Sequence, residues 1–248
     1  MNLLSEIATP RYWNTAANRA SADIIKQKLE GYNLDRVYFE DFNNSGSGRN
    51  VIGEIGSGNK YFVIGAHRDS VNNCNGSVDN AAGTVSVLEA ARILSTCKSQ
   101  LSEYTIRFVL FDGEEVGYRG SLYYIQNHSA ENTTAMANFD CTGETNASTL
   151  RVYRNNYNSS IALAADNACQ YLETTGMPAC SRMGNGTNSD HMSFKNAGIE
   201  YIWTTNNNIC GQCLHCSSCA DNMSRIGLAQ LTWAGRFAVY TIADSYLK

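Results

Sequence analysis

Two adjacent glutamates, Glu114 and Glu115, end the apolar run 105–111 and could support hydrolase chemistry. Neighbouring side chains at a strand end point to opposite sides, so one carboxylate can hold a metal ion while the other faces a substrate as a proton carrier. A Glu-Glu pair is a weak signal by itself, because most such pairs lie on a solvated surface. It gains weight only where other metal-binding side chains occur at matching positions.

Further acids and imidazoles follow the other apolar segments of the chain: His67, Asp69, Asp79, Asp140 and, far downstream, His215. The run 61–66 ends at His67, and the run 135–139 ends at Asp140. Asp79 precedes the apolar segment 84–94, which is long enough for a buried helix. In an open α/β sheet the carboxyl ends of the strands form the crevice where ligands bind, so these side chains are expected to converge.

Each of these residues has an ordinary structural explanation. A strand-end aspartate is usually a turn or cap residue, and a lone histidine is usually a hydrogen-bonded interior residue. Together, however, they concentrate negative charge at one rim, and a cation should neutralise it. The mixture of nitrogen and oxygen donors suits zinc, and an odd number of ligands suits two ions that share one bridging carboxylate.

The ordered set of motifs resembles the co-catalytic di-zinc aminopeptidases. The resemblance is carried by Ala66-His67-Arg68-Asp69-Ser70, Asp79-Asn80-Ala81-Ala82-Gly83, Phe111-Asp112-Gly113-Glu114-Glu115-Val116-Gly117, Gly120-Ser121, Ser189-Asp190-His191-Met192-Ser193-Phe194 and His215. The same superfamily includes glutamate carboxypeptidases, glutaminyl cyclases and transferrin-receptor-like ectodomains. The resemblance implies a metal-dependent exopeptidase that hydrolyses the N-terminal peptide bond of peptides, with two zinc ions and a glutamate general base.

The resemblance also implies a set of metal ligands. Asp79 would bridge the two zinc ions. Glu115 and His215 would complete one site, whereas His67 and Asp140 would complete the other. A cis peptide bond would follow Asp79, because relatives have one there. His191 would pack beside the site and is not counted as a ligand.

The remaining implied roles concern catalysis and substrate binding. Asp69 would hydrogen-bond the ligand imidazole and fix its tautomer, and Glu114 would be the general base. Spare carboxylate oxygens of Glu114 or Asp140 would hold the free α-amine. Leu214 replaces the usual aromatic oxyanion donor before the last histidine, so another tyrosine is expected to substitute. The candidates are Tyr201, Tyr153 and Tyr118, and the expected substrate-binding positions are Glu114, Asp140, Tyr201 and Leu214.

Two other functional classes share this fold. A glutaminyl-cyclase-like acyltransferase would use one zinc ion; the segment 79–83 and the absence of a tryptophan before His215 argue against it. A non-catalytic binding ectodomain would have no need to keep five ligands and Glu114 converging, since buried polar groups are costly. The aminopeptidase is therefore the leading interpretation.

Four of the nine cysteines stand at regular three-residue steps around His215: Cys210, Cys213, Cys216 and Cys219. A metal cluster is conceivable, but bacterial-type cluster sequences widen the last gap and continue with proline. Local disulfides that staple this loop are preferred to a cluster or to free thiols. The odd total leaves at least one thiol free or intermolecular. The other cysteines, Cys74, Cys97, Cys141, Cys169 and Cys180, cannot be paired from the sequence.

The alternation of expected strands and helices without a linker predicts one domain over residues 1–248, and the resemblance implies that it is a zinc peptidase domain. The fold class is α/β, and the resemblance implies a three-layer α/β/α sandwich with a mixed, mainly parallel central sheet of about eight strands. Expected strands are 37–42, 50–55, 61–66, 105–111, 134–139, 150–154 and 200–204; expected helices are 16–29, 84–94, 121–127, 160–174, 192–196 and 224–246. Short connections before Asn50 and Lys60 predict an antiparallel start to the sheet. His128 matches no motif and is expected at the surface.

Composition and charge restrict the binding partners and the cellular compartment that can be expected for this chain. A formal charge of −4 without a basic stripe argues against nucleic acid. No apolar run reaches membrane-spanning length, so no membrane partner is expected. Cysteine usage and eight Asn-x-Ser/Thr triplets are compatible with a secreted, extracellular or periplasmic protein whose signal segment is absent from this chain. The expected partners are peptides with a free N-terminus, with an apolar first residue favoured, and the chain is expected to be a monomer.

Overall fold

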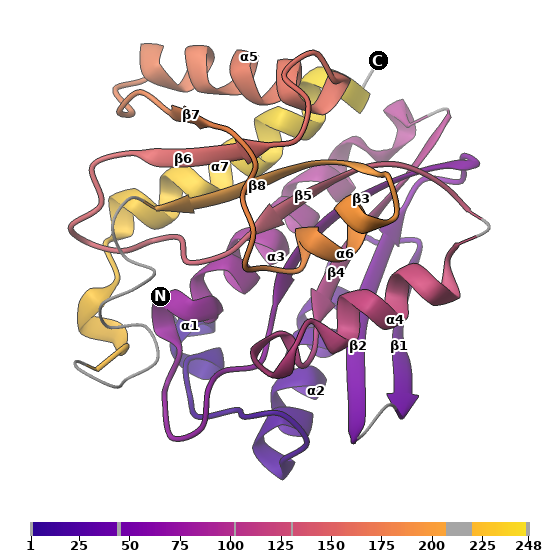
Figure 1. The fold of residues 1–248 in the computed structure, drawn as a ribbon, viewed down its shortest axis with the longest axis vertical. Coiled ribbons are helices and arrows are strands. Elements are labelled where there is room, and N and C mark those ends of the chain that lie inside the picture. The colour runs from indigo at the N-terminus through magenta and orange to yellow at the C-terminus, as the bar shows by residue number, and fades with distance from the viewer. Residues whose placement is uncertain (1, 44–45, 102, 130, 207–219, 247–248) are drawn as a thin grey trace.

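A computed structural model describes residues 2–43, 46–101, 103–129, 131–206 and 220–246 (Figure 1). The strands are β1 (Arg36–Asn43), β2 (Ser47–Ile55), β3 (Lys60–His67), β4 (Tyr104–Phe111), β5 (Asn132–Phe139), β6 (Leu150–Arg154), β7 (Ser181–Met183) and β8 (Glu200–Asn206). The helices are α1 (Asn2–Ile7), α2 (Ala16–Glu30), α3 (Gly83–Leu94), α4 (Arg119–Asn127), α5 (Ser160–Thr174), α6 (His191–Asn196) and α7 (Leu228–Tyr246). Shorter helical turns cover Ser77–Ala82, Ser95–Gln100, Glu114–Val116 and Met223–Arg225.

The strands form one mixed eight-stranded sheet in the order β1-β2-β4-β3-β5-β8-β6-β7. β3 runs parallel to both β4 and β5, and β8 runs parallel to β5. β1, β2 and β4 pair antiparallel, which confirms the predicted antiparallel start. β6 is antiparallel to β8 and parallel to β7. The carboxyl ends of β3, β4 and β5 therefore lie side by side at one edge of the sheet.

Helices cover both faces of the sheet, so the predicted three-layer sandwich is confirmed (Figure 1). Side chains alternate along β3, with Phe62 and Ile64 in one core and Val63 in the other. Helices α2, α3, α5 and α7 contribute to the first core, and α4 and α6 contribute Tyr124 and Phe194 to the second. No helix among the described residues is long and apolar enough to cross a bilayer.

The expected strands and helices all occur, with small shifts at their ends. The sequence analysis missed α1 and β7; β7 has only three residues, too few to show an alternating pattern. The last helix begins at Leu228 instead of Ser224. The reason is local, because the Asn222 side chain accepts a hydrogen bond from the Ser224 backbone N–H at 2.9 Å and starts a separate one-turn helix.

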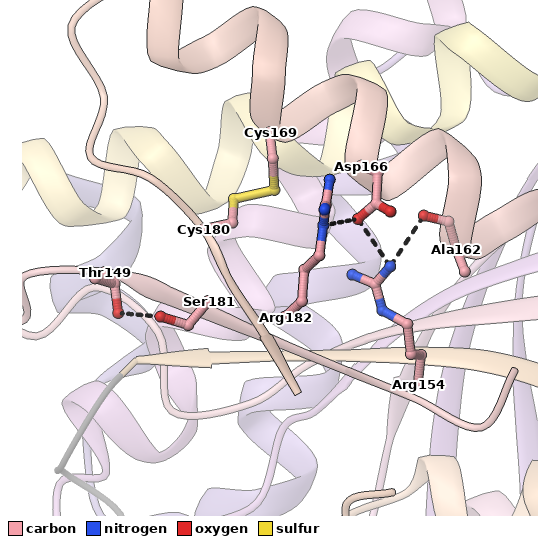
Figure 2. The surroundings of a disulfide bond; sticks show 8 residues. All are labelled: Thr149, Arg154, Ala162, Asp166, Cys169, Cys180, Ser181 and Arg182. Atoms are coloured by element: carbon pink, nitrogen blue, oxygen red, sulfur yellow. Dashed lines mark hydrogen bonds and ion pairs between the residues drawn. A yellow bond between two sulfur atoms is a disulfide. The ribbon is translucent and has the colours of Figure 1, made fainter. Parts of the chain in front are cut away.

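Contacts with α5 hold the short edge strand β7 in place (Figure 2). A disulfide joins Cys169 of α5 to Cys180, which directly precedes β7. Asp166 of α5 accepts hydrogen bonds from Arg154 and Arg182, both at 2.8 Å. Among the other cysteines, Cys74 is disulfide-bonded, Cys97 is a free thiol, and the Cys141 thiol donates to Asp140 Oδ1 at 3.2 Å. The cysteines at 210, 213, 216 and 219 lie outside the described residues.

His128 is not a surface residue, contrary to the expectation. Its side chain is only 12% exposed, with Nε2 at 2.8 Å from a Glu40 oxygen and Nδ1 at 2.9 Å from a Glu131 oxygen. Its ring also lies 4.3 Å from that of Tyr124, centroid to centroid. The end of α4 packs against β1, and the distant Glu40 and the nearby Glu131 enclose the imidazole. The sequence around His128 contains no sign of this arrangement.

Candidate metal centre

The carboxyl edge of the sheet gathers the residues that the motifs singled out. His67 ends β3, Asp140 follows β5, and the one-turn helix Glu114–Val116 follows β4. Asp79 lies in the turn between β3 and α3. The His67 Nε2 atom is 2.9 Å from Asp79 Oδ1 and 3.4 Å from Asp140 Oδ1. Three separate segments thus meet at one imidazole nitrogen.

The turn that carries Asp79 is held on both sides. The Asp79–Asn80 peptide bond is cis, as the resemblance predicted. The Asn80 side chain donates to the Phe139 carbonyl at 2.8 Å, which ties the turn to the end of β5. Asp221 accepts the backbone N–H groups of Val78 and Asp79 at 2.8 and 2.9 Å. The position of the Asp79 carboxylate is therefore set by contacts from two distant parts of the chain.

Asp69 connects the imidazole to both glutamates. It is fully buried, and its Oδ1 lies 3.4 Å from His67 Nδ1. Its two oxygens also accept the backbone N–H groups of Glu114 and Glu115, each at 3.2 Å. One carboxylate therefore orients the ring and anchors the turn after β4.

Two sets of three described residues have ligand atoms close enough to hold a metal ion. One set is His67, Asp79 and Asp140; the other is His67, Glu114 and Glu115, and within each set the atoms lie within 4.8 Å of one another. Imidazole nitrogen and carboxylate oxygen are donors that suit zinc. The expected ligand His215 and the expected substrate-binding residue Leu214 lie outside the described residues.

The glutamates sit in surroundings that disfavour their charged forms. Burial is the largest cause for Glu114, and the charges of Asp140 and Asp190 add to it, so its pKa lies well above the usual value despite the nearby imidazole. Burial followed by the charge of Asp79 raises the pKa of Glu115 to about 9. Burial and the neighbouring acids thus both disfavour the charged forms of these glutamates, and a divalent cation would offset both effects.

His67 responds to the same charges in the opposite sense. Burial by itself lowers its pKa, but the charges of Asp140 and Glu114 outweigh that cost and raise the pKa well above the usual value. Burial also acts against the charged forms of Asp69 and Asp140, yet the imidazole holds the pKa of both below the usual range. The imidazole is thus the main cation among the acids.

A second group of buried residues packs beside these acids. Asp190 is fully buried, and burial is the largest cause that raises its pKa to about 7. The His191 ring stacks 4.9 Å from Trp203 and lies 4.7 Å from Tyr201. Burial lowers the pKa of His191 to about 4, so the ring is neutral at pH 7. Tyr201 is fully buried within the second core.

Two buried arginines, Arg11 and Arg68, were not identified from the sequence. Arg68 separates His67 from Asp69 in the chain, and its Nη2 lies 2.6 Å from Asp112 Oδ2, with both side chains fully buried. Asp112 directly follows β4, so this ion pair ties the ends of two neighbouring strands. In the sequence, Arg68 and Asp112 each stand beside an apolar run, and such positions are too common to identify a site.

Comparison with known proteins agrees with this geometry. Residues 50–242 match the family described as Peptidase family M28. Leupeptin-inactivating enzyme 1 of Streptomyces exfoliatus is 32% identical over 209 residues, which cover 80% of this chain and 46% of that protein. The chain thus spans about half the length of this relative.

Solved structures share the fold. A zinc aminopeptidase from Bacillus subtilis aligns with a TM-score of 0.82 and 19% identity, over 98% of this chain and 93% of that one. A glutaminyl cyclase from Bacteroides thetaiotaomicron, bound to N-acetylhistamine, aligns with a TM-score of 0.80 and 20% identity, over 97% and 95% of the two chains. At these identities the similarity establishes the architecture.

The pKa directions predict that metal-free protein loses stability as the pH rises from about 5 to about 9. The folded pKa of Glu115 is about 9 and that of Asp190 about 7, so the unfolded chain, with ordinary pKa values, releases these protons first. His67, whose folded pKa is also raised, stabilises the fold at low pH and loses that contribution as the pH rises. Asp69 and Asp140 have lowered pKa values and act only at more acidic pH.

Thermal unfolding of chelator-treated protein across this pH range would measure the effect. Glu115→Gln should flatten the curve, because it removes a group whose folded pKa of about 9 lies far above its ordinary value. A metal-free unfolding midpoint that rises with pH over the same range would contradict the prediction.

Proposed function

The chain belongs to Peptidase family M28, and we propose that it is a zinc-dependent aminopeptidase that removes the N-terminal residue of peptides. The observation that carries the proposal is the convergence of Asp79, Asp140 and two glutamates on His67 at the sheet edge. The name of the Bacillus subtilis relative, aminopeptidase YwaD, 32% identical over 146 residues, supports the same activity. The disulfides at Cys169 and Cys74 support an extracellular or periplasmic location.

The donor set fits two zinc ions. His67 and Asp140 would hold one ion, Glu115 and His215 would hold the other, and Asp79 would contribute to both. Bound zinc makes a coordinated water more acidic and polarises a carbonyl. Carboxylates that are buried and crowded, as here, gain most from such a cation.

Glu114 is proposed as the group that moves protons. Its partly buried carboxylate lies beside His67, so it can take a proton from the attacking water and pass it to the leaving amine. Asp69 would support this step indirectly, because it fixes the backbone of both glutamates and faces His67. Free oxygens of Glu114 and Asp140 would accept hydrogen bonds from the substrate's α-ammonium group.

Tyr118 is proposed as the donor to the developing oxyanion. Burial is the largest cause of its raised pKa, followed by the charges of Glu114, Asp190 and Asp140, and these charges support a position near the acids. Its φ of 56° is uncommon for a bulky side chain. Tyr153 instead stacks on Trp203 at 4.7 Å.

The fold also matches a glutaminyl cyclase, so an acyltransferase with one zinc ion is the second candidate. The number of bound zinc ions and the reaction product distinguish the acyltransferase from the aminopeptidase. The cyclase would close an N-terminal glutamine on itself and release ammonia. The aminopeptidase would instead release a free amino acid.

Purified protein should cleave aminoacyl chromogenic amides with a free α-amine and should leave their N-acetylated counterparts intact, because acetylation removes the charge that the carboxylates bind. A chelator should abolish the activity, and metal analysis should approach about two zinc ions per chain. One zinc ion at saturation, with cyclisation of N-terminal glutamine, would favour the acyltransferase. A zinc-loaded protein that does neither would overturn both candidates.

The two glutamates should behave differently when each is replaced by its amide. Glu114→Gln should keep both metals, because it retains the shape of the side chain, but kcat should fall by at least ~100-fold with the loss of the base. Glu115→Gln should instead weaken zinc binding, since a neutral amide is a poor zinc ligand. Zinc titration and kcat are measured on both variants, and each variant serves as the control for the other. Metal loss in the Glu114 variant alone would mean that the two roles are reversed.

Tyr118→Phe should lower kcat by about 100-fold with KM little changed, because the hydroxyl would bind the oxyanion only as it develops. Tyr153→Phe is the matched control, since it removes the same atom from a tyrosine that stacks on Trp203. Steady-state kinetics on a single aminoacyl amide would compare the two. Full activity of Tyr118→Phe would exclude it as the donor.

A further inference from the structure

Arg11 reaches the candidate metal centre from outside the region that matches the family. It lies between α1 and α2, before residues 50–242, and its side chain is fully buried. The guanidinium donates to four backbone carbonyl oxygens, those of Thr9, Arg68, Asn75 and Gly76. The Arg11 backbone N–H also donates to the Ser70 hydroxyl at 3.1 Å. These acceptors, apart from Thr9, belong to the loop between His67 and Asp79.

Both ends of this loop, residues 68–76, meet at the one guanidinium. Its Nε is 2.6 Å from the Arg68 carbonyl oxygen, directly after His67. Its Nη2 is 2.9 Å from the Gly76 carbonyl oxygen, three residues before Asp79. The planar guanidinium has five donors in fixed directions, so it can hold two carbonyls at a set separation, which a single ammonium group cannot do.

The backbone at Gly76 is adapted to this contact. Its φ is +54°, and a Cβ there would lie 2.2 Å from the Asp79 carbonyl oxygen and 3.2 Å from Arg11 Nη2. Asp221 holds the next residues through the N–H groups of Val78 and Asp79. The turn that carries Asp79 is therefore held from two sides. The Arg11 guanidinium binds the carbonyl oxygens before the turn, and the Asp221 carboxylate binds the N–H groups within it.

We infer that Arg11 is a positioning residue that sets the separation of His67 and Asp79 by holding both ends of loop 68–76. The two side chains it places would contact the same zinc ion, so this inference rests on the proposed function. Arg11 itself would touch neither metal nor substrate. Its contribution would be to keep the ligands in place before the metal arrives.

A simple charge-compensating role makes the opposite prediction. Arg11 is cationic at neutral pH: burial lowers its pKa to about 10, and the charges of Asp69, Asp79 and Asp221 oppose that decrease. If it only balanced these acids, its removal would leave them more negative and zinc would bind more tightly. If it positions the loop, its removal weakens zinc binding. The sign of the change separates the two roles.

The test compares Arg11→Met and Arg11→Lys with Arg154→Met. Arg154 is a matched control because it is also buried, but it lies on β6 and donates to Asp166 and Ala162 of α5 (Figure 2). Zinc affinity is measured by competition with a chromophoric chelator, and amide hydrogen exchange of residues 68–79 is followed in metal-free protein. Arg11→Met should lose about tenfold or more in zinc affinity and exchange faster in this segment.

Arg11→Lys should show a smaller effect in the same direction, because lysine keeps the charge but cannot bridge the loop ends. Arg154→Met should lower the unfolding midpoint while zinc affinity and exchange at 68–79 stay as in the wild type. Unchanged or tighter zinc binding by Arg11→Met, with wild-type exchange in the loop, would overturn the inference. If Arg11→Met does not fold, Arg11→Lys decides by the same two measurements. If the wild type binds no zinc, the proposed function fails and the exchange comparison alone decides on Arg11.

Discussion

The crowding of buried carboxylates around one imidazole is the constraint on which the rest of this site depends. Asp79 and Asp140 both approach His67 Nε2, Asp69 faces the other ring nitrogen, and two glutamates lie beside them. Buried negative charges are stable only when they are paired or hydrogen-bonded. The pKa values of Glu114 and Glu115 are raised, first by burial and then by the charges of neighbouring acids. A divalent cation would supply the positive charge that balances these carboxylates.

Backbone N–H groups stabilise part of this buried negative charge, and the same arrangement occurs twice. Asp69 accepts the N–H groups of Glu114 and Glu115, and Asp221 accepts those of Val78 and Asp79. Each aspartate thereby gains two hydrogen bonds that favour its charged form. Each also fixes the backbone of a segment that carries a proposed metal ligand. Stabilising the charge and positioning the ligand are thus achieved by one set of contacts.

Buried arginines complete the arrangement from the side of the N-terminal segment. Arg68 pairs with Asp112 and joins the ends of β3 and β4, while Asn18 of α2 donates to the same aspartate at 2.8 Å. Arg11 closes loop 68–76 through three carbonyl oxygens and the Ser70 hydroxyl. Helix α2 and the residues before it therefore support the loops after two neighbouring strands. This support explains how a rim of mutually repelling acids can keep a defined geometry.

The strands that carry the site could be located without a structure. Apolar runs that end on an acid or imidazole are local features. The resemblance carried by the ordered motifs implied the cis peptide bond after Asp79, which the structure contains. The contacts that position these residues were not accessible in the same way. Arg11 meets Arg68 across 57 positions, Asp221 meets Val78 across 143, and the pairing of Cys169 with Cys180 and the burial of His128 depend equally on packing. Nothing in the local pattern encodes such partners, because a buried charge finds its partner only when the elements that carry both have been packed together.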